Sequence, residues 1–120
     1  MFDLANFDIT RFEANAAQAA RLLRALSNER RLMILCQLAD GELSVGELQP
    51  RVGLSQSALS QHLAVLREEA IVATRREGQT IWYRIADPAA IKVVATLAEI
   101  FCPPDMRKPH DQSSDPPGAR

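Results

Sequence analysis

Residues 53–63 read Gly-Leu-Ser-Gln-Ser-Ala-Leu-Ser-Gln-His-Leu, and the fold can be inferred outward from these residues. Residues 53–55 separate two short segments of helical periodicity, which is the spacing of a helix-turn-helix. Ser55 is a favoured N-cap residue, so the helix after the turn is expected to run from there to about residue 69. The helix before the turn is expected to begin at a capping box, with Ser44 as the N-cap and Glu47 three residues further on.

The helix after the turn has two faces of different character. At about 100° per residue, Leu59, Leu63 and Leu66 fall on one side and predict a contact with the core. The opposite face carries small, uncharged side chains that form hydrogen bonds, namely Ser57, Ser60 and Gln61, with Gln56 at its edge. A solvated face usually carries Lys and Glu, whereas a helix in a DNA major groove needs close approach and groups that read base edges. The sequence therefore predicts a DNA recognition helix.

A β-hairpin is expected after this helix. Residues 71–76 and 80–85 are rich in strand-forming side chains, and residues 77–79, Glu-Gly-Gln, form a short loop between them. The side chains expected around its tip are Arg75, Arg76 and Gln79. A hairpin that follows a recognition helix is the wing of a winged helix, whose tip reaches phosphates or the minor groove. Solvated surface charge is the alternative interpretation of the two arginines.

The remaining segments complete a mainly α-helical fold with one hairpin. Helices are expected over residues 13–26, 29–39 and 88–102, which gives the order helix, helix, short helix, helix, strand, strand, helix. Three regions follow from this pattern: an N-terminal segment over 1–12, a winged-helix DNA-binding and dimerisation domain over 13–102, and a disordered tail over 103–120. The tail holds five prolines and almost no apolar side chains.

Composition places the chain among small proteins with one domain. Its 120 residues are 47% hydrophobic, with a net charge of −1, whereas many DNA-binding domains are strongly basic. The basic residues are nevertheless clustered, since residues 21–31 hold four arginines and one acid. The sequence contains neither a long apolar run nor a signal peptide, which predicts a cytoplasmic protein without a membrane partner and with reduced thiols.

The last predicted helix, residues 88–102, indicates self-association. Its polar side chains Lys92, Thr96 and Glu99 form one narrow stripe, and the rest of its surface is apolar. A helix that is apolar on most sides must be covered on most sides. We therefore expect a homodimer in which this helix and the first helix pack against the partner. A twofold dimer is expected to bind a double-stranded, pseudo-palindromic operator with half-sites roughly 34–36 Å apart.

Three stretches resemble the arsenic-repressor (ArsR) family of bacterial winged-helix repressors. They are residues 26–32 (Leu-Ser-Asn-Glu-Arg-Arg-Leu), residues 54–63 and the wing over 75–83, and the resemblance extends over about residues 13–102. It implies a dimer that represses by blocking an operator and leaves it when an inducer binds. An enzyme is not indicated, because the chain lacks a Cys-x-x-Cys motif, a catalytic His with a partner and a Gly-rich phosphate loop. No cofactor is predicted.

The chain departs from the metal sites of this family. The usual Cys-x-Cys positions align with Ser44 and Gly46, and residues 88–102 contain neither His nor Asp. His62 lies beside the apolar face of the recognition helix, so packing or a wing contact is expected there. Zinc takes about four N or S ligands, and no such set is visible. No metal site is predicted, and a metal- or metalloid-responsive repressor stays as the alternative function.

Two cysteines remain: Cys36, near the end of the second helix, and Cys102, at the end of the last. With their sequence context they resemble the persulfide-responsive branch of the family, the BigR/SqrR-like sensors, and the related HlyU-type regulators. The resemblance implies that a small sulfur-containing inducer leads to a sulfur bridge between the two thiols, which relieves repression. Packing is the alternative, because a free cysteine is often a small core residue. No basic residue lies one turn from Cys36, so any activation must come from tertiary neighbours.

Overall fold

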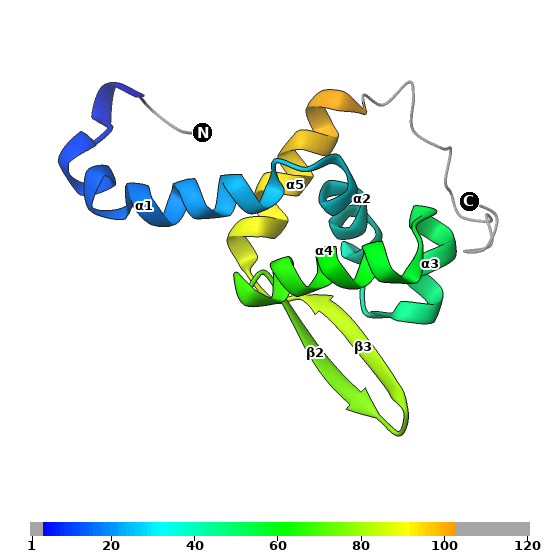
Figure 1. Cartoon of the computed structure of the whole chain (residues 1–120). Helices are drawn as coiled ribbons and strands as arrows, with labels where there is room; N and C mark the ends of the chain where they lie inside the picture. Colours follow the sequence, from blue (N-terminus) through cyan, green and yellow to red (C-terminus); the bar gives the residue numbers. More distant parts are fainter. Residues whose placement is uncertain (1–3, 103–120) are drawn as a thin grey trace.

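The computed structural model describes residues 4–102, and the tail predicted over 103–120 lies outside the described residues. A 3-10 helix (Leu4–Asn6) comes first. The helices are α1 (Ile9–Leu26), α2 (Glu29–Leu38), α3 (Val45–Val52), α4 (Gln56–Glu68) and α5 (Pro88–Phe101). The strands are β1 (Leu43–Ser44), β2 (Val72–Glu77) and β3 (Thr80–Ile85). Figure 1 shows the hairpin extending from the helical body beside α4, which confirms the winged helix-turn-helix.

Local capping signals explain where the helices begin. Ser44 and Glu47 form the predicted capping box at α3, and the Ser55 side chain accepts a hydrogen bond from the Ala58 N–H at 3.1 Å. The first helix begins at Ile9, four residues before the predicted start at 13. The reason is Asp8, whose carboxylate accepts a hydrogen bond from the Arg11 N–H at 3.2 Å and caps the extra turn.

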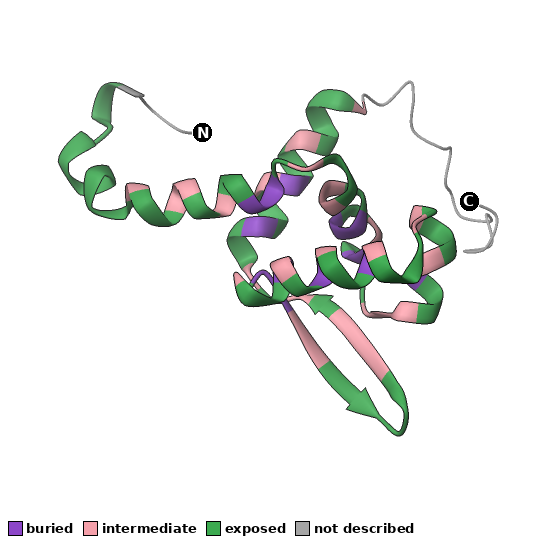
Figure 2. Cartoon of the chain, viewed as in Figure 1, coloured by how far each residue is buried: buried purple, intermediate pink, exposed green. Residues whose placement is uncertain are grey.

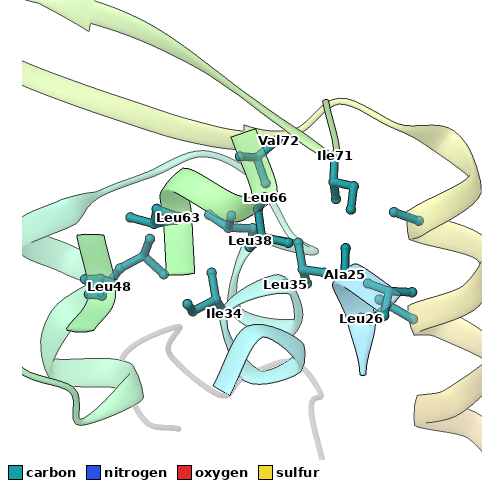
Figure 3. Close-up of a cluster of buried hydrophobic side chains, with 13 residues drawn as sticks. Ala25, Leu26, Ile34, Leu35, Leu38, Leu48, Leu63, Leu66, Ile71 and Val72 are labelled. Atoms are coloured by element: carbon teal, nitrogen blue, oxygen red, sulfur yellow. The ribbon is translucent and has the colours of Figure 1, made fainter. Parts of the chain in front are cut away.

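The core lies around α2, which contacts α1, α3, α4, α5 and β3. Leu59, Leu63 and Leu66 of α4 are fully buried, as predicted for that face. Figure 3 shows Leu63 and Leu66 meeting side chains from α2, α3 and the start of β2. Removing such side chains from water contributes about 1.5–3 kcal/mol each, so this cluster fixes the rotation of α4 and the face that it presents to solvent.

The sheet has one strand more than predicted. The two residues of β1 pair antiparallel with β3, and the strand order is β1-β3-β2. The loop of the hairpin is also shorter than expected, because Glu77 pairs with Thr80 and leaves only Gly78 and Gln79 between the strands. Gly78 has a φ of 63°, a conformation that a two-residue hairpin turn requires at its first central position.

Two helices leave apolar side chains uncovered. Figure 1 shows α1 projecting from the body, and within it only Ala25 and Leu26 are buried (Figure 2). Leu23 is 58% exposed, although it shares a helical face with the buried Leu26. In α5, Ile91 is 45% exposed and Phe101 is 75% exposed. Among the described helices, none has the length and apolar character needed to cross a membrane.

Candidate nucleic-acid interface

The helix-turn-helix presents α4 with its polar face outward. Gly53 ends α3 with a φ of 68°, and the Gln49 side-chain amide donates to the Leu54 carbonyl at 3.2 Å, which braces the turn. Four exposed side chains lie on the outer side of α4: Gln56, Ser57, Ser60 and Gln61. None of the four forms a side-chain hydrogen bond within the part of the chain that the structure describes. Their donors and acceptors are therefore available to an external ligand.

A concave surface joins α4 to the wing. It encloses about 430 Å³ and is lined by Ser60, Ala64, Arg67, Glu68 and Tyr83. The structure thus places the exposed face of α4 next to the face of the hairpin that carries Tyr83. Groove reading combined with backbone contacts requires an exposed helix and a hairpin on the same side of a protein.

Arg75 is engaged on the opposite face of the wing. Its Nε donates to both carboxylate oxygens of Glu42 at 2.9 Å, and its Nη1 lies 3.5 Å from Glu77. Its guanidinium also lies over the Trp82 ring, 5.3 Å from the centroid. Exposed ion pairs of this kind contribute about 0–1 kcal/mol each. The pair with Glu42 attaches the wing to the segment that precedes β1.

Arg76 lies on the other face of the wing because neighbouring residues of a strand point to opposite sides. It pairs with Ile81, two residues from Tyr83, and so shares the face that carries the concave surface. It has no ion pair in the described part of the chain, and Gln79 is exposed in the turn. The sequence grouped both arginines at the tip, whereas the structure separates them. The alternation of side chains along a strand could have shown from the sequence that Arg75 and Arg76 point to opposite faces.

His62 has a contact that the sequence did not indicate. Its side chain is half-buried, and its Nδ1 lies 3.5 Å from Nη1 of Arg31 in α2. Burial lowers the pKa of His62 most, and the positive charges of Arg31 and Arg30 lower this pKa further. Within the described residues, no group of three or more His, Cys, Asp or Glu side chains is arranged to hold a metal ion.

The two cysteines lie on helices that pack against each other. Cys36 is exposed on α2, Cys102 is half-buried at the end of α5, and both are thiols. Partial burial raises the pKa of the Cys36 thiol. No charged group contributes to that shift, and a raised pKa leaves less of the reactive thiolate.

Comparison with known proteins gives the family. The model of the bacterial regulatory protein arsR family matches residues 28–74. The transcriptional activator HlyU of Vibrio cholerae is 49% identical over 98 residues, which is 82% of this chain and 91% of that protein. The solved structure of reduced HlyU from the same organism has a TM-score of 0.73 and 51% identity, and the match covers 77% of this chain and 97% of that one.

Two further solved structures are similar to this chain. The transcriptional repressor BigR from Xylella fastidiosa has a TM-score of 0.76 and 45% identity, over 80% of this chain and 98% of that one. A homodimeric winged helix-turn-helix DNA-binding domain from Mycobacterium bovis has a TM-score of 0.67 and 34% identity, over 82% and 90%. With its recognition helix, wing and these relatives, the chain belongs to the arsR family of bacterial regulatory proteins and is a DNA-binding transcriptional regulator, not an enzyme.

Proposed function

We propose that this protein is a homodimeric repressor that leaves its operator when Cys36 and Cys102 become bridged by sulfur. The observation that carries DNA binding is the exposed Ser and Gln face of α4 beside the concave surface shared with the wing. Each subunit would place α4 in a major groove and the wing along the adjacent backbone. Repression then follows from occupation of the operator.

Exposed apolar side chains support the dimer. Leu23 of α1 and Ile91 of α5 are about half exposed, and a groove of about 600 Å³ lies between α1 and the body. Phe12, Leu22 and Ile71 are among the residues that line this groove. A second copy would bury these surfaces, and the similar domain from Mycobacterium bovis is homodimeric. Two copies of α4 related by a twofold axis fit a pseudo-palindrome.

The sulfur bridge can form in a reaction with an organic persulfide in which atoms and electrons balance. An organic persulfide, RSSH, is attacked by a cysteine thiolate, which gives a cysteine persulfide and RSH. For a bridge with one extra sulfur, two cysteine thiols and two RSSH yield Cys–S–S–S–Cys, two RSH and one H₂S. The inducer is therefore both the sulfur donor and the oxidant. The packing of α2 on α5 supports this pairing, and a relative whose structure is described as its reduced form agrees with a thiol function.

Enrichment of DNA from a random pool tests the operator function. The reduced protein is incubated with random 40-base-pair duplexes, and the bound fraction is amplified and sequenced over several rounds. We expect an enriched pseudo-palindrome with half-sites about one helical turn apart. A pool that stays random after several rounds would reject the function.

Gln61→Ala is expected to weaken binding to the enriched duplex by about 1–3 kcal/mol and to relax the choice of base at one position in each half-site. The reason is that the exposed Gln61 amide offers a donor and an acceptor to a base edge. Binding curves on the enriched duplex and its single-base variants measure the effect. Gln49→Ala is an unsuitable control, because Gln49 braces the turn. Gln79→Ala serves instead, because Gln79 lies in the wing and is expected to contact the DNA backbone. If Gln61→Ala weakened binding to every duplex equally, that result would contradict base reading by Gln61.

Arg76→Ala is expected to weaken binding to all duplexes alike and to reduce the slope of log affinity against log salt by about 1. Arg75→Ala is the matched control, because it removes the same charge from the neighbouring position, where the side chain is held by Glu42. We expect the slope for Arg75→Ala to stay near that of the wild type. A larger change in slope from Arg75→Ala than from Arg76→Ala would contradict this placement of the wing.

A further inference from the structure

Arg31 connects the end of α1 to the recognition helix, although it belongs to α2. Its Nε donates to the Ala25 carbonyl at 2.6 Å, and its Nη2 donates to the Arg24 carbonyl at 3.4 Å. The Arg24 carbonyl also accepts from the N–H and the hydroxyl of Ser27, so the Ala25 contact is the main one. A cation at the C-terminal end of a helix complements the helix dipole. The other side of the same guanidinium faces α4, where Nη1 lies 3.5 Å from Nδ1 of His62.

This contact defines the state of His62. A guanidinium only donates hydrogen bonds, so Nδ1 of His62 must accept, which requires a neutral imidazole with its proton on Nε2. The lowered pKa of His62, caused by burial and then by Arg31 and Arg30, favours the same neutral form. His62 lies between exposed Gln61 and buried Leu63 in α4. A contact at this edge therefore limits rotation of α4 about its own axis.

We propose that Arg31 is a positioning residue for operator recognition, because it holds α4 through His62 in a fixed orientation relative to the C-terminal end of α1. The inference rests on the proposed function, in which α1 takes part in the dimer and α4 reads the operator. Specific binding needs both recognition helices in register with successive grooves. Nonspecific binding depends mainly on phosphate charge and tolerates a rotated helix. Loss of Arg31 should therefore reduce specificity more than general affinity.

Arg30 provides a matched control. It is adjacent in the same helical turn, it is exposed, and its side chain forms no hydrogen bond or ion pair within the described residues. Arg30→Gln thus removes one positive charge near His62 and leaves the carbonyls of α1 bound by Arg31. Arg31→Gln removes the same charge together with the contacts.

The experiment measures anisotropy of two labelled duplexes, the one enriched from the random pool and a scrambled duplex of equal length. Arg31→Gln is expected to lose about tenfold in affinity for the enriched duplex and less than about twofold for the scrambled one. Arg31→Lys should fall between the wild type and Arg31→Gln, since an ammonium lacks the planar fork. Arg30→Gln should change both affinities by the same factor. The inference is overturned if Arg31→Gln binds the enriched duplex like the wild type, or loses both duplexes equally.

A second set of variants tests the contact from α4 and leaves the fold of α1 untouched. His62→Ala is expected to lose about tenfold on the enriched duplex, and His62→Asn, whose oxygen lies near the place of Nδ1, should recover most of it. The double variant Arg31→Gln/His62→Ala should lose about tenfold, not the hundredfold of two independent changes. A hundredfold loss, or equal affinities for His62→Ala and His62→Asn, would overturn the coupling. A failure of the proposed function is distinguishable, because then no duplex is enriched at all.

Discussion

Ile91→Glu is expected to produce a monomer that no longer binds the operator at concentrations where the wild type is saturated. Ile91 is 45% exposed on α5, beside the buried Ala90, so it lies at the border between the core and the uncovered surface. Within one subunit the change is tolerable, because the carboxylate can reach water. In an apolar interface the same carboxylate would be buried without a partner, which costs several kcal/mol at each of two symmetric positions.

Sedimentation velocity at micromolar concentration gives the assembly state directly. Lys92→Glu is the control, because Lys92 is the next residue of α5 and belongs to the exposed polar stripe. It should remain a dimer. Leu23→Glu in α1 should behave like Ile91→Glu, because Leu23 is also uncovered in one subunit. Val94→Glu is unsuitable, because Val94 is buried within its own subunit and the change would damage the fold itself. A wild-type monomer, or an Ile91→Glu dimer with full operator affinity, would contradict the proposed interface.

Local signals in the sequence were sufficient for the five described α-helices, the hairpin and the exposed face of α4. Ser44 and Ser55 cap α3 and α4 as predicted, because capping depends on residues only three positions away. The period of Leu59, Leu63 and Leu66 identified the buried side of α4 and therefore the exposed side. The strand β1 was missed because two residues carry no periodic pattern.

Contacts between distant residues could not be predicted in this way. Arg75 meets Glu42 across 33 positions, and Arg31 meets His62 across 31. Such pairs depend on how the helices and the sheet pack, which one sequence does not reveal. Leu23 illustrates a second gap. Apolar periodicity marks a side chain for burial, but it does not indicate whether the same subunit or a partner covers it.

The second large effect concerns the thiols. Bridging Cys36 to Cys102 in the wild type is expected to lower affinity for the enriched duplex by about 5–150-fold, the usual range of an allosteric coupling. A disulfide holds two Cα atoms about 4.4–6.8 Å apart, and each added sulfur extends that reach by about 2 Å. A bridge would fix the end of α5, a helix of the proposed interface, against α2, which supports α4. The spacing of the two recognition helices would then no longer match the groove repeat.

Serine variants separate the bridge from other effects of the inducer. Cys36→Ser and Cys102→Ser should each bind the enriched duplex like the reduced wild type, because neither thiol lies on the exposed face of α4 or in the wing. Neither variant should respond to persulfide, since a bridge needs both sulfurs. Zinc and arsenite, added to the reduced protein, test the alternative of a metal or metalloid sensor. Release of DNA by either one, without persulfide, would favour that alternative.

Treatment of the operator-bound wild type with an organic persulfide, with intact mass and DNA release measured in the same sample, shows whether the bridge releases the protein. We expect a mass that corresponds to one Cys36–Cys102 bridge per subunit, with or without added sulfur, and release that follows the bridged fraction. A reductant should restore both the original mass and the binding. Release from a protein of unchanged mass, or a fully bridged protein that stays on the operator, would contradict the proposed thiol switch.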